Sequence, residues 1–369
     1  PAGPAMQIDA RVEAWASLQL IPGLSPRALV ALLKAFGGPA EVLAAARASL
    51  GKWVSAELAS AIAHGADPGE LSRSLSWLAE AGHALVAWDD AAYPSALLTI
   101  GDPPPVLYYA GKLELLNRPA LAIVGSRHAT PQGRENAQAF AAALSAAGLT
   151  IVSGLAQGID AAAHRGGLAG AGNSIAVVGT GIDRIYPASN KALAHRLAED
   201  GGLLSQFTLG TPPLPGNFPR RNRVISGLAR GVLVVEATPN SGSLITARFA
   251  AEQGREVFAI PGSIHSPFSK GCHRLIKDGA KLVETAQDVL EELGLAPAAA
   301  STRTPAGTAS AADGDTARVL DALGHDPADA DALAERTGLS ASAIAVALVE
   351  LELEGHVAPL PGGAFQRVM

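Results

Sequence analysis

The residues of this sequence whose chemistry is easiest to interpret lie between 217 and 248, in a basic cluster followed by a Ser/Gly turn. The cluster and the turn comprise Arg220, Arg221, Arg223 and Arg230, then Asn240, Ser241, Gly242 and Ser243. No Asp or Glu occurs from 201 to 235, and Glu236 is the only acid between 201 and 251. Because a helix N-terminus offers unpaired N–H groups and arginine binds phosphate through two hydrogen bonds, this stretch predicts a phosphate-binding surface.

Two further segments carry groups suited to anions. Gly125-Ser126-Arg127 follows an apolar run, and both its serine hydroxyl and its guanidinium can donate to phosphate. Lys191 extends the basic edge after the run 174–178. The first segment is not the G-x-G-x-x-G fingerprint, and no acid follows about twenty residues later to hold a ribose, so no nicotinamide cofactor is predicted.

Asp160 and His164 are the candidates for acid–base chemistry, because they lie one helical turn apart. They could act as a pair, or they could form hydrogen bonds that shape the loop 153–160. We favour the second interpretation, since a hydrolase would need a nucleophile or a metal beside them. The histidines His128, His164, His265 and His273 lack the spacing of metal ligands. We therefore predict no catalytic residue, no cofactor and no metal.

From residue 120 onward, short apolar runs alternate with helical segments. The predicted strands are 120–124, 150–152, 174–178, 202–204, 231–235 and 256–260. The predicted helices are 132–147, 161–168, 191–199, 224–228 and 244–253. Continuous apolar strands separated by helices indicate a parallel sheet covered on both faces. The predicted fold class is therefore α/β, with a Rossmann-like core.

Helical modules flank this core. Residues 7–70 predict short helices around a tight turn, typical of a helix-hairpin-helix or SAM-like domain that contacts either DNA phosphates or protein. The Rossmann-like domain extends over 71–294, and the Ala/Ser/Thr/Pro-rich segment 295–314 predicts a flexible linker. Three helices and a hairpin in 315–369 predict a winged-helix domain.

Charge is unevenly distributed along the 369 residues, whose net charge is −6. Residues 284–369 hold 14 of the 34 acids and 4 of the 28 basic residues, a net charge of −10. Residues 1–283 therefore carry +4, and the two parts are expected to have different partners. No apolar run long enough to span a bilayer and no signal segment is evident, which predicts a soluble cytoplasmic protein without membrane contact. The single Cys272 excludes an intrachain disulfide.

The middle of the chain, over about residues 75–295, resembles the DNA-processing protein A (DprA/Smf) family. The segments that carry the resemblance are GSR at 125–127, SGLAQGID at 153–160, GTGIDRIYPASN at 179–190, FPRRNRVISGLA at 218–229, EATPNSGSLITARFAAEQGREVFAIPG at 236–262 and GCHRLIKDGA at 271–280. The resemblance implies a Rossmann-type domain that binds single-stranded DNA, dimerises and helps load RecA recombinase during natural transformation. It implies no enzymatic activity.

Site residues transfer to this sequence where its motifs match those of the family. The implied DNA contacts are Ser126, Arg127, Lys191, Arg221, Asn222, Arg223, Ser241, Gly242 and Thr246. Arg220 belongs to the same basic cluster, and Phe218 beside it could stack on a base or anchor the segment in the core. Leu275 and Ile276 resemble part of a dimer-contact helix.

Two positions depart from the family pattern. Ser205-Gln206 stands where a Ser-Glu pair is usual, which removes an acid beside the basic groove. Gly271-Cys272-His273 stands where Gly-x-Asn is usual, so the resemblance to the family is weaker in this loop.

We expect a single-stranded DNA-binding homodimer that protects DNA and helps load RecA in transformation and recombination. The alternative is a nucleotide-binding enzyme of the phosphoribohydrolase type, with Glu236 as its glutamate. A sequence-specific regulator is disfavoured, because the presumed recognition helix 340–354 contains three Glu and no Lys or Arg.

Overall fold

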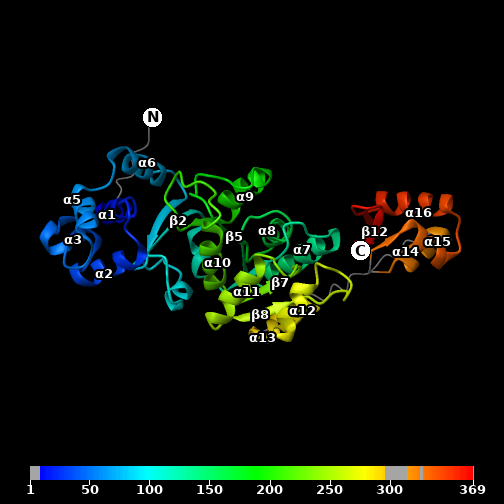
Figure 1. Cartoon of the computed structure of the whole chain (residues 1–369). Helices are drawn as coiled ribbons and strands as arrows, with labels where there is room; N and C mark the ends of the chain where they lie inside the picture. Colours follow the sequence, from blue (N-terminus) through cyan, green and yellow to red (C-terminus); the bar gives the residue numbers. More distant parts are fainter. Residues whose placement is uncertain (1–8, 296–313, 325–326, 369) are drawn as a thin grey trace.

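The computed structural model describes residues 9–295, 314–324 and 327–368, which form three units along the chain. Figure 1 shows the N-terminal helices and the C-terminal domain at opposite ends of the molecule, with a large α/β unit between them. The predicted linker 295–314 lies almost entirely outside the described residues, so it stays a prediction.

A nine-stranded sheet with the order β1-β2-β6-β5-β4-β3-β7-β8-β9 forms the central unit. Its strands are β1 (His83–Ala87), β2 (Val106–Gly111), β3 (Ala120–Val124), β4 (Thr150–Ser153), β5 (Ser174–Val177), β6 (Gly202–Ser205), β7 (Gly231–Val234), β8 (Glu256–Ala259) and β9 (Lys281–Leu282). All pairs from β6 to β9 are parallel, whereas β1–β2 and β2–β6 are antiparallel. Strand order reverses at β3, which has β4 on one side and β7 on the other. Open α/β sheets bind ligands at the carboxyl edge of such a switch point.

The six predicted strands correspond to β3–β8, and each agrees with the prediction within one residue. The α/β class and the Rossmann-like core are confirmed. Every residue of β3, β4, β5, β6 and β7 is buried, which is why these strands appear as uninterrupted apolar runs rather than as alternating patterns. The antiparallel pair β1–β2 widens the sheet beyond the predicted parallel core.

Helices cover both faces of the sheet. They are α7 (Pro131–Ala146), α8 (Ile159–Gly167), α9 (Lys191–Asp200), α10 (Asn217–Leu228), α11 (Ser243–Glu252), α12 (Lys270–Lys277) and α13 (Ala286–Glu292), with short 3-10 turns η1 (Ser95–Thr99), η2 (Leu113–Asn117) and η3 (Ala188–Asn190). On one face, α7, α8 and α13 pack over Leu121, Ile123 and Leu233. On the other, α10 and α11 contribute Val224, Ile225 and other apolar side chains to a separate cluster.

Helix α10 is longer than the sequence predicts. It begins at Asn217, whereas the predicted helix begins at residue 224. Pro219 occupies the first turn, where a proline removes no hydrogen bond within the helix. Arg220, Arg221 and Arg223 therefore lie on a helix, whose successive residues are rotated by about 100°, whereas Arg230 follows the helix. Its arginines consequently point in different directions and cannot all face one surface.

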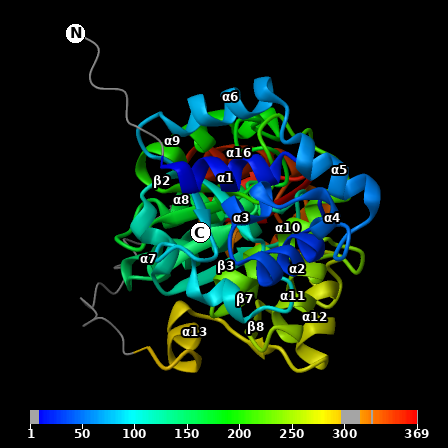
Figure 2. The ribbon, with the colours of Figure 1, turned by 90° about the vertical axis from the view of Figure 1, so that its left-hand side faces the viewer.

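The N-terminal helices pack directly on the antiparallel edge of the sheet (Figure 2). They are α1 (Ala10–Gln19), α2 (Pro26–Phe36), α3 (Pro39–Ala44), α4 (Arg47–Leu50), α5 (Ala56–His64) and α6 (Pro68–Leu78). The Trp15 and Trp88 rings meet edge to face with centroids 6.3 Å apart, and Trp77 meets Tyr108 in the same way at 6.0 Å. The two predicted domains thus share one hydrophobic core.

The C-terminal domain has the helices and the hairpin of a winged-helix fold. It contains α14 (Asp315–Leu323), α15 (Ala330–Thr337) and α16 (Ala341–Leu353), with β10 (Ala328–Asp329), β11 (Val357–Pro359) and β12 (Ala364–Arg367) in the order β10-β12-β11. Leu333, Ile344 and Leu351 lie in its core. Within the described ranges no single helix is long and apolar enough to cross a membrane, and only α15 with α16, bent by 112°, reach that length and apolarity together.

Candidate nucleic-acid interface

Three loops meet at the carboxyl edge of β3, β4 and β7. The Ser126 N–H donates to the Glu236 carbonyl oxygen (2.8 Å), and the Ile159 N–H donates to the Ser126 carbonyl oxygen (3.2 Å). Gly158 adopts φ +74°, and a Cβ there would lie 2.3 Å from the Ser126 carbonyl oxygen, so glycine is required. Ser126 itself is buried, and its Oγ accepts from the His128 N–H (3.1 Å). Ser126 therefore holds the shape of the loop in this structure.

An exposed cation and two aromatic rings lie in a row beside these loops. The Arg127 Cζ is 5.7 Å from the centroid of the Phe218 ring, which lies 5.8 Å from that of Tyr186. Arg127 is exposed, and Tyr186 is 46% exposed. Phe218 is half-buried against Gly179, where a Cβ would lie 2.9 Å from its ring. Phe218 thus packs on the loop at Gly179, and its ring lies beside Arg127 and Tyr186.

Two more exposed basic residues lie on neighbouring elements. Lys191 begins α9, and Arg220 lies on α10 with its Cζ 5.5 Å from the Phe207 ring centroid. We refer to Arg127, Tyr186, Lys191, Phe218 and Arg220 together as the rim. The sequence analysis did not assign Tyr186 to the DNA-binding site. Its position as an aromatic residue between basic ones is the signal that could have identified it.

Arg221 differs from the expectation of an exposed groove arginine. It is 5% exposed, and its guanidinium donates to the carbonyl oxygens of Gly154 and Val177. A Cβ at Gly154 would lie 2.7 Å from the guanidinium, so glycine makes this approach possible. Burial lowers the pKa of Arg221 to about 10, an effect that the nearby Asp160 opposes. Arg221 ties the ends of β4 and β5 together beneath the rim.

Arg223 and Asn222 also bind protein groups. The Arg223 Nη2 donates to the Gln206 Oε1 (2.7 Å), and the guanidinium also binds the carbonyl oxygen and the carboxylate of Asp102. The Asn222 Nδ2 donates to the Gly242 carbonyl oxygen (3.4 Å), which connects α10 to the start of α11. Arg223 thus anchors the connector before β2 through Asp102. The two residues are far apart in sequence, so the motifs did not predict this pairing.

The Ser/Gly turn begins α11 as predicted, with Gly242 as the N-cap residue. Gly242 is exposed and Ser241 is half-buried, with its Oγ 2.7 Å from that of Ser243. Thr246, by contrast, is 1% exposed and lies inside the unit. The structure therefore leaves Ser241 and Gly242 accessible at this helix N-terminus and corrects the expectation that Thr246 lies at the surface.

Asp160 and His164 are both buried and have separate partners. The Asp160 carboxylate accepts from the N–H groups of Gly154 (3.1 Å) and Ala156 (3.3 Å). Because the Ser174 hydroxyl donates to a backbone carbonyl, the His164 Nδ1–H donates to the Ser174 Oγ (2.7 Å). This agrees with the favoured loop-shaping interpretation. Within the described residues, no group of three or more His, Cys, Asp or Glu side chains has the arrangement of a metal site.

Protonation of His164 is expected to destabilise the fold in acid. Burial lowers its pKa to about 3, with Arg221 and Arg165 adding repulsion, whereas an unfolded histidine has a pKa of 6.5. Below pH 6.5 the unfolded chain therefore binds a proton that the folded chain excludes until about pH 3. The free energy of unfolding should fall by about 1.4 kcal/mol per pH unit as pH decreases through this window.

Urea denaturation at a series of pH values measures this dependence. Burial raises the pKa of Asp160, which acts in the opposite direction, so the His164→Gln variant provides the comparison. Below pH 6.5 the variant should take up about one proton fewer than the wild type when it unfolds. Its free energy of unfolding should therefore change less steeply with pH. An unchanged dependence would contradict the assignment.

Glu236 supports the start of α7. Its carboxylate accepts from the Thr130 Oγ1–H (2.6 Å) and the Thr130 N–H (3.0 Å), while the Thr130 Oγ1 accepts from the Gly133 N–H as the helix cap. Burial raises the pKa of Glu236, and the bonds from Thr130 oppose that shift. A carboxylate at a helix N-terminus is a stabilising arrangement. These contacts give Glu236 a structural role at the start of α7.

Comparison with known proteins identifies the family. The family model described as DNA recombination-mediator protein A matches residues 84–294, and that of the DprA winged helix domain matches residues 303–363. This chain belongs to the DNA-processing protein A (DprA/Smf) family. The match confirms the resemblance found in the sequence motifs, and it also confirms the winged-helix domain.

Members of the DprA family match most of the chain. Protein Smf of Escherichia coli is 44% identical over 298 residues, which cover 79% of this chain and 80% of that protein. The crystal structure of DprA from Streptococcus pneumoniae is 39% identical, with a TM-score of 0.68, and covers 78% of this chain and 99% of its own. A structure described for the single-stranded DNA binding mode of Helicobacter pylori DprA is 30% identical, with a TM-score of 0.52, covering 57% of this chain and 95% of its own.

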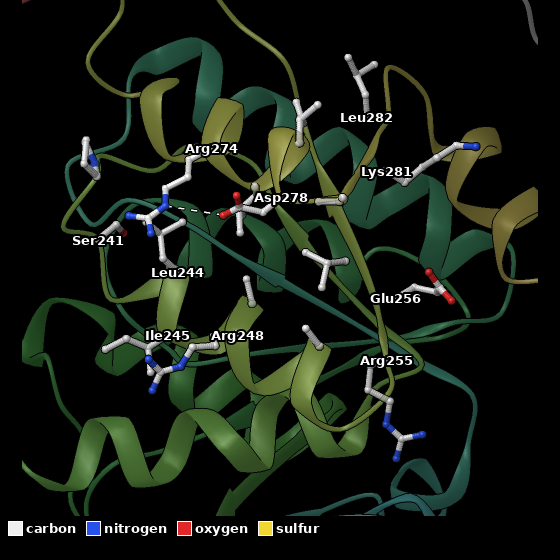
Figure 3. Close-up of a pocket in the computed structure, with 18 of the residues that line it drawn as sticks. Ser241, Leu244, Ile245, Arg248, Arg255, Glu256, Arg274, Asp278, Lys281 and Leu282 are labelled. Atoms are coloured by element: carbon white, nitrogen blue, oxygen red, sulfur yellow. Dashed lines mark ion pairs between the residues drawn. The ribbon is translucent and has the colours of Figure 1, made fainter.

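The residues that match the dimer-contact helix of the DprA family border a groove of about 960 Å³ (Figure 3). Leu275 and Ile276 on α12 and Leu244 on α11 line it, and Arg274 forms an ion pair with Asp278 at 3.6 Å. Cys272 in the same helix is buried, and burial raises the pKa of its thiol to about 12. The cysteine at this departure from the family pattern is therefore a packed, unreactive thiol.

Proposed function

We propose that this chain binds single-stranded DNA along the rim and acts in DNA processing during natural transformation and recombination. The observation that carries the proposal is the row of Arg127, Phe218 and Tyr186, in which an exposed guanidinium lies beside two aromatic rings. Proteins that bind single strands without sequence preference combine cations for the phosphates with aromatic faces for the bases. Lys191 and Arg220 lengthen the path for phosphates.

Family membership supports the same function. The Streptococcus pneumoniae and Bacillus subtilis relatives are DNA processing proteins, and single-stranded DNA binding is described for the Helicobacter pylori protein. We extend the proposal to protection of the strand and to loading of RecA recombinase on it in the cytoplasm. The proposal assigns direct phosphate contacts to Arg127, Lys191 and Arg220, with Ser241 and Gly242 at the adjoining helix start. It assigns Ser126, Arg221, Asn222, Arg223 and Thr246 to support of this surface.

The role proposed is one of binding rather than catalysis. The enzyme alternative requires the Glu236 carboxylate to face a substrate, but both of its oxygens accept hydrogen bonds from Thr130. The winged-helix domain is not assigned to DNA, because α16 has no Lys or Arg and carries Glu350 and Glu352. Phosphate contacts dominate DNA affinity, so an acidic helix is unsuited to the major groove.

Direct titration tests the proposal. The fluorescence anisotropy of a labelled single-stranded oligonucleotide should rise as the full chain is added, and the midpoint should move to higher protein concentration as salt increases. If the anisotropy stays constant when the protein is added at low salt, the proposal is wrong.

We further propose that the groove along α12 is the contact between two copies of the chain. Its lining combines apolar side chains with charges of both signs, a mixture that also occurs in protein interfaces. Leu282 at the groove is 43% exposed. Two copies would also place two rims in one particle, which raises avidity for a long strand.

The mass of the particle tests the dimer. Light scattering after size exclusion should give twice the chain mass for the wild type and the mass of a single chain for Ile276→Glu, because a buried charge prevents association. Leu98→Glu is the matched control, since Leu98 is 51% exposed on η1, outside the groove. A wild-type monomer, or an Ile276→Glu dimer of unchanged strength, would contradict the proposal.

A further inference from the structure

A small slot lies between the N-terminal helices and the Rossmann-like unit, next to one end of the rim. Its volume is about 180 Å³. Leu24 and Leu29 from the α1–α2 hairpin and Pro105 before β2 form an apolar wall. Phe207 and a set of polar side chains also line the slot, namely Gln19, Gln206, Thr208, Thr211 and Arg220. None of the described residues that line the slot is acidic. The slot is therefore lined by apolar and uncharged polar side chains together with the Arg220 guanidinium, and its walls carry no negative charge.

Gln206, which lines the slot, has an unused hydrogen-bond donor. Its Oε1 accepts from the Arg223 Nη2 at 2.7 Å. Because a guanidinium only donates, the amide must present its oxygen to Arg223 and its NH2 group elsewhere. The Gln206 Nε2 is buried and has no hydrogen-bond partner among the described residues. Buried donors are nearly always paired, so this amide favours a bound acceptor.

Arg220 connects the slot with the proposed path of the strand. It is exposed on α10, two residues after Phe218, and its Cζ lies 5.5 Å from the Phe207 ring centroid. A phosphate held by Arg220 would place the neighbouring base beside the slot. The volume is about that of six water molecules, below the 300–1,000 Å³ typical of sites for drug-sized ligands. A single planar ring fits this size better than a whole nucleotide.

We propose that the slot binds one pyrimidine base with a carbonyl oxygen, such as thymine, turned out of the strand on the rim. The Gln206 amide donates to that oxygen, and the leucine and proline side chains cover the ring. The inference rests on the proposed single-stranded DNA binding and adds a base preference to it. It also gives the α1–α2 hairpin a role, since it forms one wall of the slot.

Anisotropy titrations of the full chain with thymidine and adenosine oligonucleotides of equal length test the proposal. The wild type should bind the thymidine strand more tightly, and Gln206→Glu should reduce the ratio of the two affinities about tenfold, the worth of a lost hydrogen bond. The glutamate still accepts from Arg223 but cannot donate. Its charge affects both strands alike, so it cancels in the ratio.

A second variant and a control complete the test. Leu24→Trp fills the slot from the hairpin side without changing Gln206, and it should reduce the same ratio. Gln287→Glu makes the same chemical change on an exposed residue of α13 and should keep the wild-type ratio. A wild-type ratio in either slot variant would overturn the base pocket while leaving the rim intact. Failure of the wild type to bind either strand would instead overturn the proposed function and the pocket with it.

Discussion

Replacement of Arg221 by alanine is expected to lower the free energy of unfolding by about 3–5 kcal/mol, the cost of removing one partner of a buried charge pair. The guanidinium holds the carbonyl oxygens of Gly154 and Val177 and opposes the effect of burial on the pKa of Asp160. Without it, two buried acceptors lose their donor and Asp160 loses its counter-charge. Urea denaturation followed by circular dichroism measures the change.

Arg220→Ala is the matched control for this prediction. Arg220 precedes Arg221 on the same helix but is exposed, so its loss should change the free energy of unfolding by no more than about 0.5 kcal/mol. Equal urea midpoints for Arg221→Ala and the wild type would contradict the structural role. Weak DNA binding by an Arg221 variant cannot be attributed to a lost contact unless the variant is folded at the assay temperature.

Replacement of Tyr186 by alanine is expected to weaken single-stranded DNA binding by about 1–3 kcal/mol, roughly 5- to 150-fold, if its ring stacks on one base. The ring is 46% exposed and adjoins Phe218, so its removal should leave the fold intact. Phe218→Ala should weaken binding further, but Phe218 also packs on Gly179 and its variant combines two effects. Anisotropy titration at fixed salt gives the affinities.

Tyr186→Phe distinguishes stacking from a hydroxyl contact. The phenylalanine keeps the ring and should retain the wild-type affinity within about twofold, whereas alanine should not. Because stacking involves no counterion, neither variant should alter the salt dependence of binding. Wild-type affinity in Tyr186→Ala would exclude this residue from the interface.

The sequence predicts the sheet well, because strands buried on both faces are uninterrupted apolar runs. It misplaces the start of α10, because Pro219 is typical of a segment before a helix as well as of its first turn. That difference determines which arginines are available. Once the helix begins at Asn217, Arg221 lies inside the molecule and Arg220 outside, a distinction that no motif in the sequence encodes.

Contacts between distant parts of the chain could not be predicted from local patterns. Arg223 binds Asp102, 121 residues earlier, so protein groups hold the guanidinium that its motif implied as a DNA contact. The boundary predicted at residue 70 follows composition, yet Trp15 on α1 packs against Trp88 after β1, and both sides of the boundary contribute to one hydrophobic cluster. Tyr186 lies in a segment that resembles the family, but only the structure places its ring beside Phe218.

The salt dependence of binding by the wild type and by Arg127→Ala tests the central claim most directly. Arg127 is exposed, and Arg47→Ala on α4 removes the same charge from an exposed residue outside the rim. We predict that Arg127→Ala binds a labelled single strand more weakly at low salt and that its slope of log K against log salt is shallower by about 0.7, the value for one phosphate contact. The Arg47 control should match the wild type. An Arg127→Ala variant with wild-type affinity and slope would contradict the account.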